Sequence, residues 1–134
     1  MTTVPLITDD GPPTVAAVFA DIRATRGADY VNNFWRGLAI DPTQLAEVWD
    51  AAKRTMAPGA LDPLTKELIY IAVSTANSCA YCVHSHTASA RAKGMTDAQH
   101  AELLAVIALA ARTNHLATAL QVPVDPVFNR TEQP

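Results

Sequence analysis

Apolar residues recur along most of the chain at intervals of three and four positions. Residues with this spacing lie on one face of an α-helix, so the pattern predicts a series of amphipathic helices. No run of alternating β-branched residues indicates a sheet. The sequence therefore predicts an all-α fold, a single-domain antiparallel helical bundle whose apolar stripes cover residues 15–22, 31–38, 45–56, 64–71 and 103–111.

Residues that favour helix ends mark several boundaries. Asp41 and Asp62 each precede a proline, and an N-cap aspartate followed by proline is typical of a helix start. Asn77-Ser78 interrupts the next stripe, and we expect it to cap a new helix that begins at Cys79 and ends at Lys93-Gly94.

The C-terminal third of the chain predicts at least one more helix. Thr96 and Gln99 have the spacing of a capping box. The helix that follows contains the most apolar stretch of the chain, residues 103–111, which is too short to span a bilayer and is predicted to be a core helix. We expect Thr113-Asn114 to start or kink a last short helix that ends at Leu120.

Composition and charge narrow the class of protein. Apolar residues make up 49% of the 134 residues and charged residues 17%, a balance that indicates apolar surface covered by sister subunits. The net charge of −3 gives no electrostatic basis for binding nucleic acid or an anionic membrane. The first residues lack the basic patch and apolar run of a secretory signal, so we expect a cytoplasmic protein. In that reducing compartment a close cysteine pair is more often catalytic or metal-binding than structural.

The two cysteines of the chain form the strongest candidate site. Cys79 and Cys82 are spaced C-x-x-C, and His86 follows the second by four residues. On a helix that begins near Cys79, the three side chains fall within about 60° of one another. The N–H groups of a helix start and a nearby imidazole both stabilise a thiolate, so this stripe can exchange electrons and protons. Two small buried apolar residues are the alternative interpretation of the pair.

Glu67 is the second candidate, because it shares an apolar stripe with Leu64, Leu68 and Ile71. A buried carboxylate is costly unless it is protonated or hydrogen-bonded. We therefore expect the pKa of Glu67 to rise toward neutrality, which suits a proton shuttle with His86. The alternative is a boundary glutamate whose carboxylate reaches water.

Three further side chains are weaker candidates. Tyr81, between the cysteines, and His115 are possible pocket residues, and packing is the alternative for both. His84 lies about 140° from Cys79 around the helix and is assigned to the surface or an interface.

The run of residues 66–86 resembles the signature of the alkylhydroperoxidase D-like proteins, which belong to the carboxymuconolactone decarboxylase superfamily. The similarity extends over about residues 45–124 and includes the flanking segments 61–67 and 93–97. The resemblance implies an all-helical fold that forms homotrimers or homohexamers, with the site near a subunit interface. Four residues stand at family spacing: Glu67, Cys79, Cys82 and His86.

The resemblance also implies a thiol peroxidase mechanism that uses no metal or organic cofactor. Cys82 would attack the peroxide and become a sulfenic acid, Cys79 would resolve it to a disulfide, and His86 and Glu67 would relay the proton. The implied substrate is a small organic hydroperoxide, and the implied electron donor is a dithiol protein, either lipoylated or thioredoxin-like. Chemistry alone leaves the attacking cysteine open, because Cys79 lies nearer the predicted helix start.

With the family included, we expect a single domain over residues 1–134. Its family-like core would cover about residues 45–124, preceded by an N-terminal helical extension at 13–38. The tail at 122–134 contains three prolines and is predicted to be extended.

Several alternatives stay open. Well-studied peroxidase members carry a histidine immediately before the second cysteine, where this chain has Tyr81. A dithiol disulfide reductase, a redox sensor, or a helper enzyme without peroxidase activity would use the same cysteine pair. A structural zinc site at Cys79, Cys82 and His86 is less favoured, because a fourth ligand is not evident. A lactone decarboxylase is disfavoured, since that branch of the superfamily lacks the cysteine pair.

Overall fold

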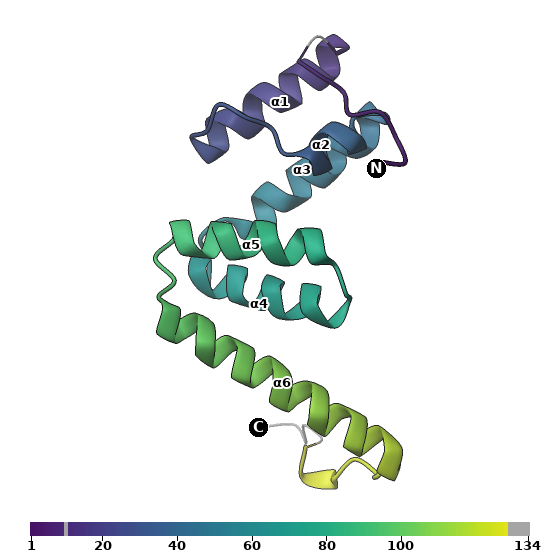
Figure 1. Cartoon of the computed structure of the whole chain (residues 1–134), viewed down its shortest axis with the longest axis vertical. Helices are drawn as coiled ribbons and strands as arrows, with labels where there is room; N and C mark the ends of the chain where they lie inside the picture. The colour runs from purple at the N-terminus through teal and green to yellow at the C-terminus, as the bar shows by residue number, and fades with distance from the viewer. Residues whose placement is uncertain (10, 129–134) are drawn as a thin grey trace, which may run out of the picture. The chain divides into compact units, whose positions relative to one another are not determined.

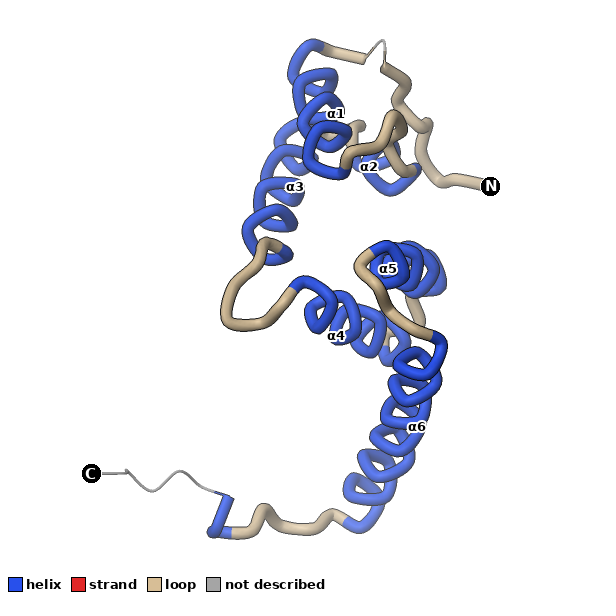
Figure 2. The backbone as a smooth tube through the Cα atoms, turned by 90° about the vertical axis from the view of Figure 1, so that its left-hand side faces the viewer, coloured by secondary structure: helices blue, strands red, loops and turns tan. Residues whose placement is uncertain are grey.

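The structure is a computed structural model that describes residues 1–9 and 11–128. These residues form six α-helices and one 3₁₀ turn, and no strand occurs among them (Figure 1, Figure 2). The predicted all-α fold is confirmed. The elements are α1 (Pro13–Arg26), α2 (Asn33–Leu38), α3 (Pro42–Met56), α4 (Pro63–Ala76), α5 (Ala80–Ala92), α6 (Asp97–Leu120) and the 3₁₀ turn η1 (Pro126–Phe128).

The chain divides into two compact units, Met1–Ala57 and a second that begins at Pro58. The first holds α1, α2 and α3, and the second holds α4, α5 and α6. The expected single-domain organisation, with its core, extension and tail, stays a prediction.

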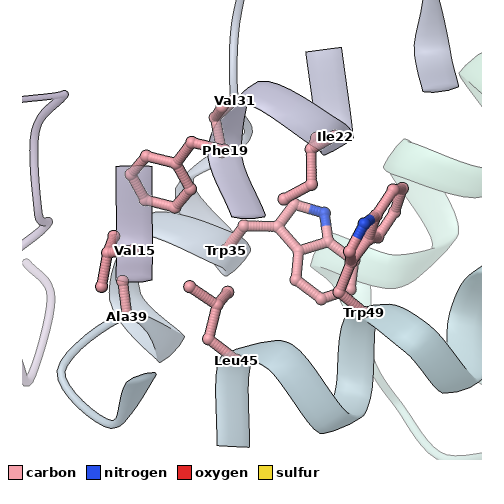
Figure 3. Packing of buried hydrophobic residues seen from close by; sticks show 8 residues of the cluster. All are labelled: Val15, Phe19, Ile22, Val31, Trp35, Ala39, Leu45 and Trp49. Atoms are coloured by element: carbon pink, nitrogen blue, oxygen red, sulfur yellow. The ribbon is translucent and has the colours of Figure 1, made fainter. Parts of the chain in front are cut away.

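The first unit packs α1 and α2 against α3 around an apolar core. Trp35 and Trp49 meet edge to face with ring centroids 5.3 Å apart, a favoured geometry for aromatic pairs (Figure 3). The indole Nε1 of Trp49 donates to Asp21 Oδ2 at 2.7 Å, so its polar atom is satisfied. The buried members of this core are Val15, Phe19, Ile22, Val31, Trp35, Ala39, Leu45 and Trp49.

Local capping fixes most of the helix boundaries as predicted. The carboxylate of Asp41 accepts the N–H groups of Thr43 and Gln44 at the start of α3. Asp62 does the same for Thr65 at the start of α4. Each carboxylate satisfies donors that have no partner within the helix, and for that reason the two helices begin where the sequence indicates.

In the second unit α4 packs against both α5 and α6. Its buried centre is small: Ile71 on α4, Ala90 on α5, and Met95 between α5 and α6. Leu103 and Ile107 of α6 pack against this centre. The extensive contact between α4 and α5 brings the helix that carries Glu67 against the helix that begins at the two cysteines.

Helix α6 corrects two predictions. The capping box of Thr96 and Gln99 is present in both directions, but the helix continues unbroken through Thr113 for 24 residues. The hydroxyl of Thr113 bonds back to the carbonyls of Leu109 and Ala110, so it is accommodated within the helix instead of starting a new one. The prediction of a core helix is also wrong, because no residue of α6 is buried in the single chain.

Helix α6 exposes many of its apolar side chains in the single chain. Only Leu103 and Ile107 pack against the core of the second unit. Within the described residues, α6 is the one helix that is long and apolar enough, by length and composition alone, to cross a membrane. Large apolar side chains exposed along it are Leu104, Val106, Leu109, Leu116 and Leu120.

The C-terminal tail follows α6 without regular structure until η1. Residues 129–134 of the predicted extended tail lie outside the described residues.

Candidate active site

The two cysteines form a disulfide at the N-terminus of α5, with Cα atoms 5.3 Å apart. Cys79 is the N-cap of α5, and its Sγ accepts the N–H of Cys82 at 3.3 Å. The expected cap at Asn77-Ser78 is therefore displaced by one residue. Ser78 has a positive φ of 57°, which turns the chain so that the N–H of Cys79 donates to the carbonyl of Ser74 at 2.9 Å.

Cys82 lies in the first turn of α5, one helical turn before His86. Side chains four residues apart share one face of a helix, so the cysteine and the imidazole belong to the same stripe. Both are partly buried. When the disulfide is reduced, the N-terminal N–H groups of α5 favour a thiolate at this position.

The carboxylate of Glu67 is the centre of a hydrogen-bonded cluster between α4 and α5. Its side chain is only 5% exposed. Oε2 lies 2.7 Å from Nδ1 of His86. Oε1 accepts from Ser89 Oγ at 2.7 Å and from Lys93 Nζ at 3.0 Å, and Lys93 also donates to Ser89 at 2.8 Å. Both carboxylate oxygens are thus hydrogen-bonded to side chains from α5 and its C-cap residue, Lys93.

This cluster overturns the expected direction of the Glu67 pKa. Burial alone raises it, as anticipated, but hydrogen bonds from His86, Ser89 and Lys93, together with the charge of Lys93, outweigh burial and lower the pKa from 4.5 to about 2. Glu67 is therefore a carboxylate at neutral pH and only a hydrogen-bond acceptor. The alternative of a glutamate reaching water is also wrong, because the side chain is buried.

The ionised state of Glu67 determines how His86 is held. An acceptor-only carboxylate requires that Nδ1 of His86 carry the hydrogen of this bond. In the neutral imidazole Nε2 is then unprotonated and able to accept a proton. Tyr70 stacks on the same ring, with centroids 3.6 Å apart and planes inclined by 20°. The imidazole is fixed both at its edge and on its face.

Sequence reasoning identified Glu67 and His86 but missed Tyr70, Ser89 and Lys93. A signal for the last two is present, since they follow His86 by three and seven residues and so share its helical face. Tyr70 likewise follows Glu67 by three residues on α4.

The remaining candidates lie elsewhere or are exposed. Tyr81 is exposed at the start of α5 and His84 is exposed one turn later, as expected for a surface or interface residue. His115 is exposed on α6. An open hollow of about 400 Å³, lined by residues such as Thr118, Val122 and Phe128, includes neither Tyr81 nor His115. Their assignment to a substrate pocket stays a prediction. Among the described residues, no group of three or more His, Cys, Asp or Glu side chains could hold a metal ion.

Comparison with known proteins identifies the family. Residues 43–125 match the carboxymuconolactone decarboxylase family. The crystal structure of the alkylhydroperoxidase AhpD core from Rhodospirillum rubrum ATCC 11170 is 64% identical, with a TM-score of 0.93 over 96% of this chain and 97% of that chain. The chain belongs to the carboxymuconolactone decarboxylase family and is AhpD-like within it, which confirms the resemblance seen in the sequence.

Two curated proteins are more distant relatives. The alkyl hydroperoxide reductase AhpD of Solibacter usitatus (strain Ellin6076) is 33% identical over 113 residues, which cover 83% of this chain and 62% of that protein. Uncharacterized protein 4 in the cox locus of Paracoccus denitrificans is 39% identical over 72 residues, which cover 54% of this chain and 61% of that protein. The matched part of this chain thus spans about three fifths of the length of each relative.

Proposed function

We propose that this protein is a thiol-dependent peroxidase that reduces organic hydroperoxides through a Cys79–Cys82 disulfide cycle. The observation that carries the proposal is the placement of the cysteine pair at the N-terminus of α5, one turn before an imidazole anchored by an ionised glutamate. The similarity to two AhpD proteins supports the same chemistry. The disulfide form of the structure corresponds to the oxidised end of the cycle.

The reaction has two chemical steps. The Cys82 thiolate attacks the terminal oxygen of the hydroperoxide, the O–O bond breaks, and Cys82 becomes a sulfenic acid while the alkoxide leaves as an alcohol after taking a proton. Cys79 then attacks the Cys82 sulfur, which forms the disulfide and releases water. A dithiol protein, lipoylated or thioredoxin-like, returns the two electrons by thiol–disulfide exchange.

His86 carries the proton in this scheme, and Glu67 holds His86 in place. Nε2 of His86 accepts the thiol proton of Cys82, directly or through water, and later delivers it to the alkoxide. The sequence indicated a Glu67 with a raised pKa that passes the proton on. In this proposal Glu67 does not carry the proton, because its lowered pKa keeps it ionised. Its role is to hold Nδ1 and to stabilise the imidazolium that forms.

The test is the intact mass and thiol count of reduced, metal-free protein before and after one equivalent of cumene hydroperoxide. We expect a loss of two hydrogens and of both thiols within seconds. The Cys79→Ser variant should stop at a sulfenic acid that dimedone traps at Cys82, and Cys82→Ser should not react. Unchanged mass over minutes, with both thiols still reactive to a disulfide reagent, would refute the peroxidase proposal.

A matched pair of histidine variants tests the proton relay. His86→Gln should slow oxidation of Cys82 by about a hundredfold to ten-thousandfold, the usual range for loss of a general base. His84→Gln, an exposed change on the same helix, should leave the rate unchanged. Equal rates in the two variants would remove His86 from the mechanism.

Tyr81 stands before the second cysteine, where well-studied peroxidase members carry histidine. This difference favours a second candidate function, that of a dithiol disulfide reductase or redox sensor. The same cysteine pair would then exchange with a disulfide substrate instead of a peroxide. Reduced protein would react faster with oxidised lipoamide or a protein disulfide than with cumene hydroperoxide. The ratio of the two second-order rate constants decides between the functions.

We further propose that the protein forms a homotrimer or homohexamer in which α6 is covered by sister subunits. We also propose that it is a cytoplasmic protein. The support for the assembly is the row of exposed apolar side chains on α6, which a single chain leaves in water. Light scattering coupled to size exclusion gives the oligomer mass. A monomer at micromolar concentration would contradict this assembly.

A further inference from the structure

The two oxygens of the Glu67 carboxylate have different partners. Oε2 faces His86, the residue that the proposed mechanism uses. Oε1 faces Ser89 and Lys93, which also hydrogen-bond to each other. Two of the three hydrogen bonds to this buried acid thus come from side chains that take no part in the proton transfer proposed above.

The second pair of contacts has a direct consequence for the imidazole. A buried carboxylate that is held at one oxygen alone can rotate about its terminal torsion, which is a soft coordinate. With Oε1 held by a hydroxyl and an ammonium, the carboxylate plane is fixed, and Oε2 points in one direction. Lys93 also supplies the positive charge that balances the carboxylate, so His86 is not needed as a permanent counter-ion.

We propose that Ser89 and Lys93 are positioning residues, which hold Glu67 as an ionised and oriented carboxylate and thereby fix His86 with Nε2 directed to the thiol proton of Cys82. The proposal rests on the function proposed above for Cys82 and His86. Neither Ser89 nor Lys93 gains or loses a proton in the step. The thiol proton moves to Nε2, the thiolate and imidazolium form, and Lys93 stays an ammonium throughout.

The low pKa of Glu67 agrees with this assignment, since hydrogen bonds from Ser89 and Lys93 are among the causes that lower it. The positions of the donors along the chain support it as well. Ser89 follows His86 by three positions on α5, and Lys93, the C-cap residue of α5, follows it by seven, so one helix and its C-cap present all three donors to one carboxylate on α4.

The first readout is the rate at which iodoacetamide alkylates Cys82 in the reduced Cys79→Ser protein at pH 7, which reports thiol activation without any peroxide. Lys93→Met should lower this rate by about tenfold, because a misplaced reacting group commonly costs this much or more. Lys93→Arg should restore most of the loss. The matched control is Arg91→Met, which removes the cation in the last turn of α5, two residues before Lys93, and an exposed ion pair with Asp97. That variant should react as the parent does.

A double-mutant cycle separates positioning from a general structural effect. If Lys93 acts through Glu67, Lys93→Met should have no further effect once Glu67→Gln is present. Equal effects of Lys93→Met in the presence and in the absence of Glu67→Gln would overturn the proposal, as would a rate that Lys93→Met leaves unchanged. Ser89→Ala is the second variant, with an expected fall of about threefold to tenfold, and circular dichroism verifies that each protein is folded.

The peroxide reaction is measured in parallel on the same variants with the full cysteine pair. An unreactive parent protein toward cumene hydroperoxide, with the alkylation cycle as expected, would reject the peroxidase and retain the positioning roles. If the parent protein reduces cumene hydroperoxide but the substitutions at Lys93 and Ser89 change neither the alkylation rate nor the peroxide rate, the peroxidase proposal stands and the positioning roles are refuted.

Discussion

Acidification is expected to destabilise the second unit through Glu67, and replacing this residue with glutamine should remove that sensitivity. Burial raises the pKa of Glu67, but the bonds from His86, Ser89 and Lys93 lower it overall from 4.5 to about 2. A carboxyl whose pKa is lower in the folded than in the unfolded state binds protons more weakly when folded. It therefore stabilises the fold above the unfolded-state pKa, and this contribution is lost as the pH falls through the folded-state value.

The size of the effect follows from the two pKa values. Since one pKa unit is about 1.4 kcal/mol, the depression from 4.5 to about 2 gives a maximum of about 3 kcal/mol. The contribution is complete above about pH 5, has fallen by about 2 kcal/mol at pH 3, and by about 3 kcal/mol at pH 2. The side chain is buried, so little of this is screened by solvent.

The assay is urea unfolding of the oxidised protein at pH 6 and pH 3, followed by far-ultraviolet circular dichroism. The wild type should lose about 2 kcal/mol more than Glu67→Gln between the two pH values. Trp35 and Trp49 both lie in the first unit, so their fluorescence follows the unfolding of that unit separately. Equal losses in the two proteins would refute the reasoning that these donors hold Glu67 ionised.

Three further outcomes are expected. Lys93→Met should raise the pKa of Glu67, because it removes an ammonium hydrogen bond and its charge, and carboxyl ¹³C NMR titration measures this directly. Phe19→Ala should destabilise the first unit by about 3–5 kcal/mol in urea unfolding, whereas Phe34→Ala should cost less than about 1 kcal/mol, since Phe19 is 1% and Phe34 47% exposed. Leu109→Lys should lower the oligomer mass in light scattering, because it places a charge on the exposed face of α6; an unchanged mass would exclude that face from the subunit interface.

Local chemistry explains why much of the fold was predictable. An N-cap carboxylate, a proline in the first turn and a capping box all act within four residues, so Asp41, Asp62 and Thr96 mark helix starts whatever surrounds them. The predicted helix boundary at Thr113 was wrong, because a threonine hydroxyl can either cap a helix or donate to a carbonyl within the same helix. The sequence does not distinguish these two uses.

The sequence indicated Glu67 and His86 as candidates, but it indicated neither the other partners of Glu67 nor the direction of its pKa. Placing Glu67 on an apolar stripe correctly indicated burial. The direction of its pKa depended on which helix covers that stripe and which donors the helix presents, and this is decided by the pairing of α4 with α5. Ser89 and Lys93 become partners of Glu67 only through that pairing. The exposure of α6 could not be predicted from the sequence either, since an apolar helix has the same sequence pattern whether its own chain or another chain covers it.

The cysteine bridge joins residues only three positions apart, at the start of a helix. In the chain-entropy model, so short a loop removes about 2 kcal/mol of freedom from the unfolded chain, against about 5 kcal/mol for a loop of a hundred residues. Opening it releases one turn of backbone that α5 already restrains through its own hydrogen bonds, including that from the N–H of Val83 to the carbonyl of Cys79. The bridge thus stabilises the fold less than a long-range disulfide would, and its reduction is expected to leave the packing of the surrounding helices unchanged.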